Sequence, residues 1–425
     1  MLLLYTFALR LYALLLRLVA PFVPKAAQWV AGRRGLLAHL QNTLRAETAP
    51  LVWFHCASLG EFEQGRPLME AFAQQYPGYK IVLTFFSPSG YEVRKNWPGA
   101  DYVFYLPLDT ATNAQRFLDV VKPRLAVFVK YEFWYYFLSE LHRRRVPTVC
   151  VSAIFRAEQA FFKPWGGLFR QILGRFSHIF TQNEASADLL RGIGLRQVSV
   201  AGDTRFDTVV NTAAAAPKAL PLLEAFVAPD GPAKRPVLVV GSSWPEDIAV
   251  LTPVLQHLTT DEATANLRII VAPHELHEAG LQQIEAILPG QTVRYSQANL
   301  ASAGSSQLLL IDSIGLLREL YRHGSFAYIG GAFGKGLHNT LEAAVFGLPL
   351  VFGPRYQKFQ EAVDLVNLGG AHAITTSEAL EQTLFNWLSN DQLRAAASTT
   401  NRQYVRDHAG ATAKIMKVLP QWLAR

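Results

Sequence analysis

The hydrophobic residues of this chain are grouped in short unbroken runs, separated by longer stretches in which apolar and polar residues follow a helical pattern. The runs lie at 51–57, 80–86, 102–106, 125–129, 148–152, 179–181 and 198–201, and a second series lies at 237–240, 268–271, 308–311, 326–329 and 350–352. Short runs that are apolar at successive positions are typical of strands buried on both faces. The alternation therefore predicts parallel sheets covered by helices on both faces.

An alanine- and proline-rich stretch that ends near Pro236 separates the two series of strands. It indicates an interdomain linker. The predicted boundaries are 36–208 for a first Rossmann-like domain, 209–236 for the linker, 237–395 for a second Rossmann-like domain, and 396–425 for C-terminal helices that can pack back on the first domain. A Ser-, Ala- and Gln-rich stretch between Gly290 and Gln307 is interpreted as a surface loop. The predicted fold class is α/β with two doubly wound domains.

The first 24 residues are almost wholly apolar, except for Arg10 and Arg17, which lie seven apart and therefore on one face of a helix. Arginine near the centre of a bilayer costs about 2.5–3.5 kcal/mol, which favours a helix lying in the membrane interface over one that spans it. Basic residues that follow at Lys25, Arg33 and Arg34 would hold this end on an anionic leaflet. We assign residues 1–35 to a membrane-associated segment. A cleaved signal peptide and a helix docked on a soluble domain are the alternatives.

The composition narrows the classes of partner. The 425 residues carry a formal charge of +7, which favours anionic partners such as phosphorylated lipid, a membrane surface or nucleotides. No helix-turn-helix, zinc-finger or RNP pattern supports nucleic-acid binding. The two cysteines, Cys56 and Cys150, lie in apolar runs and indicate neither a disulfide framework nor a thiolate zinc site.

Ligands of open parallel sheets bind beyond the carboxyl ends of the strands, so the residues there are the candidates for the site. In chain order these are Ser58, Gly60 and Glu61; Ser242 and Ser243; Pro273, His274 and Glu275; Asp312, Ser313, Ile314 and Gly315; and Lys335, His338, Asn339 and Glu342. Two such domains, with donors on one side and a lone carboxylate on the other, resemble a GT-B glycosyltransferase whose parallel sheets face a central cleft.

The segment 330–342 holds several glycines, a cation, an imidazole, an amide and a carboxylate between a predicted strand and a predicted helix. Glycines let backbone N–H groups approach a phosphate, and a helix that opens near Asn339 would direct its positive end there. Glu342 could then accept hydrogen bonds from ribose hydroxyls. The spacing differs from the dinucleotide fingerprint, which disfavours a dehydrogenase. An ordinary strand-turn-helix connection is the alternative.

Several motifs, in order along nearly the whole chain, resemble those of the 3-deoxy-D-manno-octulosonic acid (Kdo) transferases of lipopolysaccharide synthesis. They are the strand followed by Ser58-Leu59-Gly60-Glu61, the element Lys130-Tyr131-Glu132-Phe133-Trp134, the element Gly202-Asp203-Thr204-Arg205-Phe206-Asp207, the element His338-Asn339-Thr340-Leu341-Glu342, and Phe352-Gly353-Pro354 with Phe359-Gln360-Glu361. An apolar amino terminus is also found in that family.

The resemblance implies an inverting, metal-independent transfer of Kdo from CMP-Kdo to the lipid A precursor (lipid IVA) on the cytoplasmic side of the inner membrane. Glu61 would be the general base, with Glu63 as a weaker local rival. Acceptor contacts are expected at Ser58, Gly60, Arg10, Arg17 and Lys163, and Gly60 would leave room for the acceptor. CMP is expected on the second domain, at the residues named above from Ser242 to Glu342. No metal site and no other cofactor is expected.

Some positions depart from the family's pattern. Ala272 stands where the family has an arginine, so His274 or a distant cation must replace it, and Lys130 stands where the family has an acidic residue. Glu132 could pair with Arg143 or Arg144 on a nearby helix. Alternative functions are another membrane-associated GT-B enzyme that uses a UDP-sugar, a nucleotide-sugar 2-epimerase, and a non-catalytic nucleotide-sugar-binding membrane protein.

Overall fold

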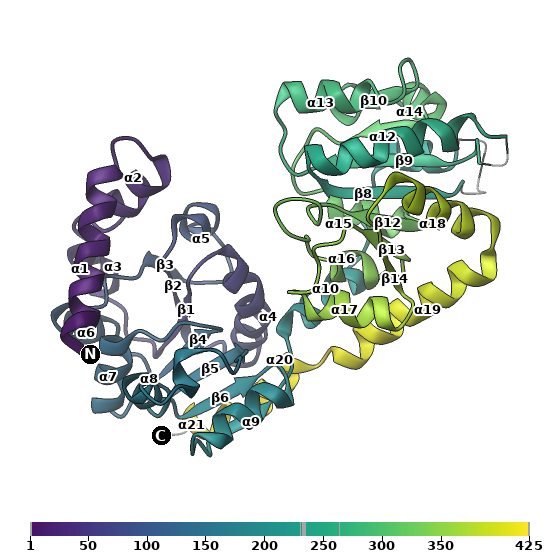
Figure 1. Cartoon of the computed structure of the whole chain (residues 1–425). Coiled ribbons are helices and arrows are strands. Elements are labelled where there is room, and N and C mark those ends of the chain that lie inside the picture. Colours follow the sequence, from purple (N-terminus) through teal and green to yellow (C-terminus); the bar gives the residue numbers. More distant parts are fainter. Residues whose placement is uncertain (1, 230, 232–234, 263, 424–425) are drawn as a thin grey trace. The chain divides into compact units, whose positions relative to one another are not determined.

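The computed structural model describes residues 2–229, 231, 235–262 and 264–423, which form two compact units. Unit 1 runs up to Thr208 and includes the segment from His408 onward, and unit 2 runs from Val209 to Asp407. Each unit contains a seven-stranded parallel sheet with helices on both faces (Figure 1). The doubly wound α/β architecture predicted from the hydrophobic runs is therefore confirmed.

The sheet of unit 1 has the strand order β3-β2-β1-β4-β5-β6-β7. Its strands are β1 (Leu51–Cys56), β2 (Lys80–Phe85), β3 (Tyr102–Tyr105), β4 (Leu125–Val129), β5 (Thr148–Ala153), β6 (His178–Thr181) and β7 (Val198–Val200). The chain winds outward from β1 in one direction and then from β4 in the other, so the strand order reverses between these two neighbours. This reversal is the point at which doubly wound sheets bind ligands, just beyond the strand ends.

Both faces of the unit 1 sheet are buried, which is why its strands read as unbroken apolar runs. Trp53 and Phe128 pack in one hydrophobic cluster, and Phe54 packs in another. The helices are α4 (Leu59–Gln75), α5 (Pro88–Arg94), α6 (Ala111–Val121), α7 (Tyr135–Arg143), α8 (Gly167–Leu173) and α9 (Glu184–Gly192), with a short 3-10 turn η1 (Ala160–Phe162).

Two C-terminal helices, α20 (Ala411–Val418) and α21 (Pro420–Leu423), belong to unit 1. Ile415 and Leu419 are fully buried in the cluster that also holds Phe54. The carboxylate of Asp207 accepts the backbone N–H groups of Gly410 and Thr412 at 2.5 and 2.6 Å. The end of the chain is thus fastened to the motif that closes the first series of strands.

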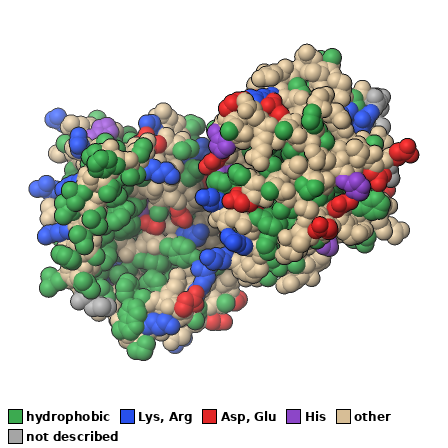
Figure 2. Space-filling model, turned by 45° about the horizontal axis from the view of Figure 1, so that its top comes forward, with side chains coloured by type: hydrophobic (Ala, Val, Ile, Leu, Met, Phe, Trp, Pro, Cys, Tyr) green, Lys and Arg blue, Asp and Glu red, His purple; other side chains and the backbone are tan. Residues whose placement is uncertain are grey.

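Three helices precede the unit 1 sheet: α1 (Leu2–Val19), α2 (Pro24–Ala31) and α3 (Leu36–Leu44). By length and composition α1 is apolar and long enough to cross a membrane, and only 6% of it is buried. One side of α1 contacts the unit, since Tyr5 donates to Asp109 at 2.5 Å and Tyr12 packs edge-on against Trp29. Most of the large hydrophobic side chains of α1 are exposed and gather at the left of Figure 2.

The sheet of unit 2 has the order β10-β11-β9-β8-β12-β13-β14, again all parallel. Its strands are β8 (Val237–Ser243), β9 (Arg268–Pro273), β10 (Thr292–Arg294), β11 (Leu308–Leu310), β12 (Phe326–Ile329), β13 (Leu350–Phe352) and β14 (Ala371–Ala373). The order reverses between β8 and β12. The two edge strands β10 and β14 are not among the predicted runs.

The helices of unit 2 are α11 (Pro221–Val227), α12 (Pro245–Thr260), α13 (Glu278–Glu285), α14 (Leu300–Ser305), α15 (Leu317–His323), α16 (Leu341–Ala344), α17 (Gln360–Asn367) and α18 (Ser377–Ser389), with a 3-10 turn η2 (Tyr295–Gln297). The helices α10 (Thr204–Ala214) and α19 (Asp391–His408) carry the chain between the units.

Two segments that were interpreted as irregular contain regular structure. In the stretch 209–236, expected to be a linker, α11 buries Leu223 and Phe226 completely. The stretch between Gly290 and Gln307, expected to be a surface loop, forms β10, η2 and α14. Both segments lie within unit 2, and their short elements lack the long apolar periods that sequence patterns reveal.

Candidate active site

Glu61 lies in the first turn of α4, directly beyond the carboxyl end of β1. The helix begins there because Ser58, in an extended conformation with φ −142° and ψ −175°, caps it and accepts the N–H of Gly60. The hydroxyl of Ser58 also donates to Oε2 of Glu61. Ser58, predicted as an acceptor contact, is therefore engaged in positioning the carboxylate.

Lys130 reaches the same carboxylate from the position directly after β4, the strand that pairs with β1 where the strand order reverses. Its Nζ lies 3.9 Å from Oε1 of Glu61, and its backbone is held at φ +68°, an unusual conformation for a residue with a side chain. The two oxygens of Glu61 thus have separate neighbours, Ser58 and Lys130. The Glu61 side chain remains 17% exposed, so a substrate can reach it.

Glu132, expected to pair with Arg143 or Arg144, instead faces the interior of unit 1. Its Oε2 lies 3.1 Å from Nε2 of the fully buried His55 and accepts the indole N–H of Trp134 at 2.7 Å. Both arginines contact Glu140. The prediction was wrong because Glu132 precedes α7 and is not on the helix, so the helical spacing rule does not apply to it.

Other predicted acceptor residues are placed differently. A Cβ at Gly60 would meet only Ser58 Oγ at 3.7 Å, which agrees with the prediction of open space there. Arg10 and Arg17 lie exposed on α1, and Lys163 follows η1, with its carbonyl bonded to Arg170. Within the part of the chain that the structure describes, none of these three cations contacts Glu61. Glu63, the local rival of Glu61, pairs with Arg94 at 2.8 Å.

In unit 2 the strands β8 and β12 meet at the reversal of strand order, and their ends bring two predicted segments together. Gly330 lies against the backbone of Ser242, since a Cβ on Gly330 would be only 2.2 Å from the Ser242 carbonyl oxygen. Ser242 itself has φ +55°. Ser243 is 3% exposed, and its hydroxyl has no hydrogen-bond partner among the described residues. A buried hydroxyl without a partner marks a place where a polar ligand atom can bind.

Asp247, which the sequence did not single out, holds this region together. Its Oδ2 accepts the N–H groups of Trp244 and Gly331, and its Oδ1 accepts the hydroxyl of Tyr328, all at 2.8 Å. Burial raises the pKa of the Asp247 carboxyl above its usual value, although the three hydrogen bonds oppose that shift. Asp247 therefore ties the start of α12 to the glycine loop after β12.

Four side chains of unit 2 form a stack that includes three predicted donor residues. The indole of Trp244 stacks on His274 with ring centroids 4.5 Å apart, and His274 lies 4.5 Å from His338. The Trp244 N–H donates to Nε2 of His338 at 2.9 Å, and Lys335 Nζ lies 5.5 Å from the indole centroid. Burial and the neighbouring His274 lower the pKa of His338 to about 4, so His338 is neutral near pH 7. Lys335 then carries the positive charge of this cluster.

Next to the stack lies a small pocket of about 30 Å³. Predicted residues that line it are Ser243, Pro273 and Glu275, and Trp244 and His277 line it as well. Glu275 lies 3.7 Å from His277. The first part of the predicted donor set is therefore brought together, and Trp244 is the residue that the sequence reasoning missed.

The turn after β11 holds Asp312, Ser313, Ile314 and Gly315. Asp312 accepts the backbone N–H of Ser296 at 3.0 Å, and Ile314 is 92% exposed. The Ser313 hydroxyl is buried without a partner among the described residues. The helix α15 begins only at Leu317, so these residues do not form its first turn. The turn therefore offers a hydroxyl and backbone groups, and the helix N-terminus lies beyond it.

Glu342 and Asn339 lie next to each other, since Asn339 Nδ2 donates to Glu342 Oε1 at 3.2 Å. Arg318 Nε lies 3.4 Å from the same oxygen, and Arg318 was not among the predicted residues. The helix expected near Asn339 is α16, which has only four residues. So short a helix carries little dipole, because the peptide dipoles sum along its length. A phosphate bound at the glycine loop would therefore meet mainly Lys335, because the N–H groups of the loop glycines already donate within the unit.

Among the residues described in the structure, no group of three or more His, Cys, Asp or Glu side chains is arranged to hold a metal ion.

Comparison with known sequences gives a consistent result. The family described as 3-Deoxy-D-manno-octulosonic-acid transferase (kdotransferase) matches residues 30–208. The chain is 27% identical to the 3-deoxy-D-manno-octulosonic acid transferase of Bordetella pertussis, over 97% of this chain and 99% of the relative. It is 26% identical to the enzyme of the same name from Haemophilus influenzae, over 88% of this chain and 87% of the relative.

Comparison with solved structures identifies the fold. A UDP-N-acetylglucosamine 2-epimerase matches with a TM-score of 0.62 and 12% identity, covering 89% of this chain and 97% of the other. MurG of Acinetobacter baumannii matches with a TM-score of 0.53 and 14% identity, covering 88% of this chain and 100% of the other. Similarity at these identities shows a shared two-domain GT-B architecture and carries no information on substrate.

Proposed function

This chain belongs to the family of Kdo transferases and is a glycosyltransferase, and we propose that it moves one or more Kdo units from CMP-Kdo to the lipid A precursor lipid IVA. The proposed reaction inverts the anomeric centre. The acceptor hydroxyl oxygen forms a bond to the anomeric carbon, and the bond from that carbon to the CMP phosphate oxygen breaks. CMP leaves with the electron pair, and Glu61 takes the proton of the hydroxyl.

The observation that carries the proposal is the placement of Glu61 within a family-matched unit. A general base must lie within reach of a substrate and in a fixed orientation. Glu61 meets both conditions, because Ser58 donates to one oxygen, Lys130 lies 3.9 Å from the other, and the side chain is 17% exposed. Gly60 beside it leaves open space for an acceptor.

For the donor we propose a site in unit 2 at the ends of β8, β9, β11 and β12. The hydroxyls of Ser243 and Ser313 are buried and unpaired within the described residues, and could bind the nucleotide. Glu342, oriented by Asn339 and Arg318, is suited to accept from ribose hydroxyls. Lys335 would neutralise the single phosphate, since the N–H groups of the loop glycines already donate within the unit, and the proposed transfer requires no metal.

We further propose that the protein acts at the cytoplasmic leaflet of the inner membrane. The apolar face of α1, the nearby cations Arg10 and Lys25, and the net charge of +7 support binding to an anionic lipid surface. Arg10, Arg17 and Lys163 stay predicted contacts of the acceptor. No observation favours a UDP-sugar donor or a 2-epimerase reaction, since the structural similarity to such enzymes reports only the fold.

The decisive experiment measures transfer by the full chain to lipid IVA, with CMP-Kdo generated in situ and the product detected by mass spectrometry. We expect Glu61→Gln to lower the rate by at least about 100-fold, which is the lower range for losing a general base. Glu63→Gln is the matched control, because Glu63 lies two residues along the same helix and pairs with Arg94. It should keep most of the activity.

CMP binding should survive in Glu61→Gln, because the proposed donor residues lie in unit 2. Full transfer by this variant would remove Glu61 as the base. Absence of transfer by the unmodified chain, with CMP binding intact, would point to another donor sugar or another lipid acceptor.

A further inference from the structure

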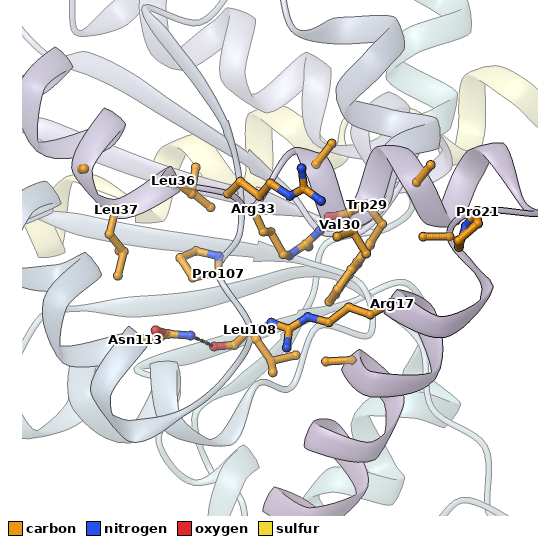
Figure 3. Close-up of a pocket in the computed structure, with 17 residues that line it drawn as sticks. Arg17, Pro21, Trp29, Val30, Arg33, Leu36, Leu37, Pro107, Leu108 and Asn113 are labelled. Carbon is orange, nitrogen blue, oxygen red and sulfur yellow. Dashed lines mark hydrogen bonds between the residues drawn. The ribbon is translucent and has the colours of Figure 1, made fainter.

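A cavity of about 1050 Å³ lies in unit 1 between α1, the corner of α2 and α3, and the loop that follows β3 (Figure 3). It is large enough for a ligand, since such sites typically measure roughly 300–1,000 Å³. Small and apolar side chains form most of its walls: Ala13, Ala20, Pro21, Ala27, Val30, Ala31, Leu36, Leu37, Ala38, Pro107 and Leu108. The walls therefore suit an aliphatic chain.

The charge of the cavity is entirely positive. Arg17, Arg33 and Arg34 line it, and no carboxylate is among the residues that line it. Arg33 is engaged in the fold, because it donates to the carbonyls of Leu106 and Phe86 at 3.0 and 2.8 Å. Burial lowers its pKa to about 9. Arg17 and Arg34 are exposed, and neither forms an ion pair with a described residue. Two free guanidinium groups beside an apolar wall suit an anion that carries an apolar tail.

Aromatic rings separate this cavity from the neighbourhood of the proposed base. Trp29 lines the cavity, its ring lies 5.9 Å from that of Phe86, and Phe86 lies 4.6 Å from Trp134. Trp134 in turn donates to Glu132. Neither Glu61 nor its neighbours Ser58 and Lys130 line the cavity, and its wall on this side includes the Trp29 indole with the Arg33 guanidinium 4.0 Å from it.

The exposed apolar face of α1 borders the same compartment. Leu14 and Leu18 flank Arg17 in the sequence and are 51% and 62% exposed, while Ala13 is buried on the side of the cavity. A helix that has one exposed apolar face and another face against the protein can lie along a bilayer, with the apolar face among the lipid tails. The mouth of the cavity would then lie at the depth of phospholipid headgroups and upper acyl chains.

We propose that the cavity binds one anionic phospholipid of the surrounding bilayer, with its phosphate on Arg17 and Arg34 and an acyl chain against the alanine-rich wall. The bound lipid holds α1, α2 and α3 at a fixed position on the membrane. This assignment gives Arg17 to a bilayer lipid in place of the acceptor, and it does not depend on the transfer reaction.

The test uses the full chain and dihexanoylphosphatidylglycerol below its micellar concentration, with binding followed by calorimetric titration and native mass spectrometry. We expect one saturable site. Arg17→Gln with Arg34→Gln should weaken binding about 10-fold or more, because charge-assisted hydrogen bonds are lost. Ala38→Trp should weaken it similarly by filling the cavity without changing the charge. Arg17, Arg34 and Ala38 are all exposed, so the substitutions should not disturb the core. Thermal melting verifies that each variant folds.

Matched controls come from the same helical segment. Arg45→Gln removes one positive charge outside the cavity, and Thr43→Trp places a tryptophan on the exposed side of α3. Both should bind the lipid as the unmodified chain does. Loss of binding with Arg45→Gln as strong as with the arginine pair, or unchanged binding in Ala38→Trp, would overturn the proposal.

Binding of two further ligands distinguishes a bilayer phospholipid from free phosphate and from the lipid acceptor. Inorganic phosphate that binds as tightly as the short-chain lipid would reduce the cavity to an anion site and overturn the proposal. Lipid IVA that displaces the probe competitively would assign the cavity to the acceptor, which also overturns it. Transfer activity is measured separately with Glu61→Gln. Absence of lipid binding in the cavity would therefore not bear on the proposed reaction.

Discussion

The side chain of Glu61 has a different neighbour on each of its carboxylate oxygens. Ser58 donates to Oε2, and Lys130 Nζ lies 3.9 Å from Oε1. The first contact comes from the residue that caps the helix, and the second comes from the position directly after the adjacent strand. A local capping contact and a long-range one therefore fix the same group, which gives a base an orientation without burying it.

The glycines of α4 provide a contrast at single-residue resolution. Gly60→Val should leave unit 1 folded, because only Ser58 Oγ lies within 4 Å of a Cβ there, yet it should raise the KM for the lipid acceptor by filling the space beside Glu61. Gly65→Val in the same helix should destabilise the unit by about 1–3 kcal/mol, since its Cβ would lie 3.0 Å from Val129 and 3.2 Å from Cys56.

The measurement combines thermal unfolding with acceptor titration for both variants. An unchanged KM in Gly60→Val would show that the acceptor does not occupy this space.

Sequence reasoning at this scale succeeded where a residue follows a strand and failed where its partner is far away in the chain. The positions of Glu61 and Ser243 follow from the strand ends, which apolar runs locate well. The partner of Glu132 is His55, 77 positions earlier, and no spacing rule connects them. Asp247 was missed for a related reason, because a carboxylate in a first helical turn usually only complements the dipole.

At the scale of elements, α1 is fastened to unit 1 by a group that titrates. Burial raises the pKa of Asp109 to about 6, even though it accepts hydrogen bonds from Tyr5 and from the N–H groups of Tyr136 and Phe137. A carboxyl whose pKa is raised by folding stabilises the folded state below its unfolded pKa of 3.8, and this contribution is lost as the pH rises through about 6.

We therefore expect unit 1 to lose on the order of 3 kcal/mol of stability from this group as the pH rises from about 4 to about 6. Asp109→Asn should flatten that part of the pH profile. Chemical denaturation across this pH range measures the slope, with Asp101→Asn as a control on an exposed carboxylate that pairs with Lys80. The same slope in Asp109→Asn as in the unmodified chain would contradict the assignment.

The element from Gly202 to Asp207 carries a structural task. Asp203 accepts from Gln64 and from Arg205, and Asp207 caps the start of α20 through Gly410 and Thr412. The motif that resembles a family signature thus binds the C-terminal helix to the first series of strands.

Asp207→Ala should therefore destabilise unit 1 by about 1–3 kcal/mol, because two N–H groups at the start of α20 lose their acceptor. Asp407→Ala is the control, since the Asp407 carboxylate accepts only an exposed hydrogen bond from Gln403 within the described hydrogen bonds. Denaturant unfolding followed by circular dichroism measures the stability of both variants. Equal stability of the two variants would rule out the capping role.

The elements that sequence patterns missed share one physical property. The twelve runs predicted to be strands are all strands, because most of them are apolar at successive positions and buried on both faces. The missed strands β10 and β14 have three residues each, lie at the edges of the sheet, and contain polar residues, with the sequences TVR and AHA. A short edge strand needs apolar residues on few positions, so its pattern does not differ from that of a loop.

For the molecule as a whole, charge and exposed apolar surface act together. The net charge is +7, and the apolar face of α1 includes Leu3 and Phe7, which are 88% and 63% exposed. Leu3→Glu with Phe7→Glu should release the protein from vesicles of phosphatidylcholine and phosphatidylglycerol without changing its unfolding temperature. Leu393→Glu is the control, because Leu393 is 51% exposed on α19 in unit 2.

Cosedimentation with the vesicles measures the effect. Retention of the double variant on the vesicles would show that α1 is not the main contact with the membrane. Release by Leu393→Glu alone would place that contact on unit 2.

Because α20 packs on unit 1 but is synthesised after unit 2, unit 1 cannot complete its core until late in translation. The cluster around Phe54 is completed only by Ile415 and Leu419, and all of unit 2 is translated in between. At about 5–20 residues per second, the roughly 200 intervening residues take on the order of 10–40 s. Until α20 has been synthesised, the nascent unit 1 therefore exposes an apolar face of its sheet, and exposed apolar surface of this kind is what chaperones bind.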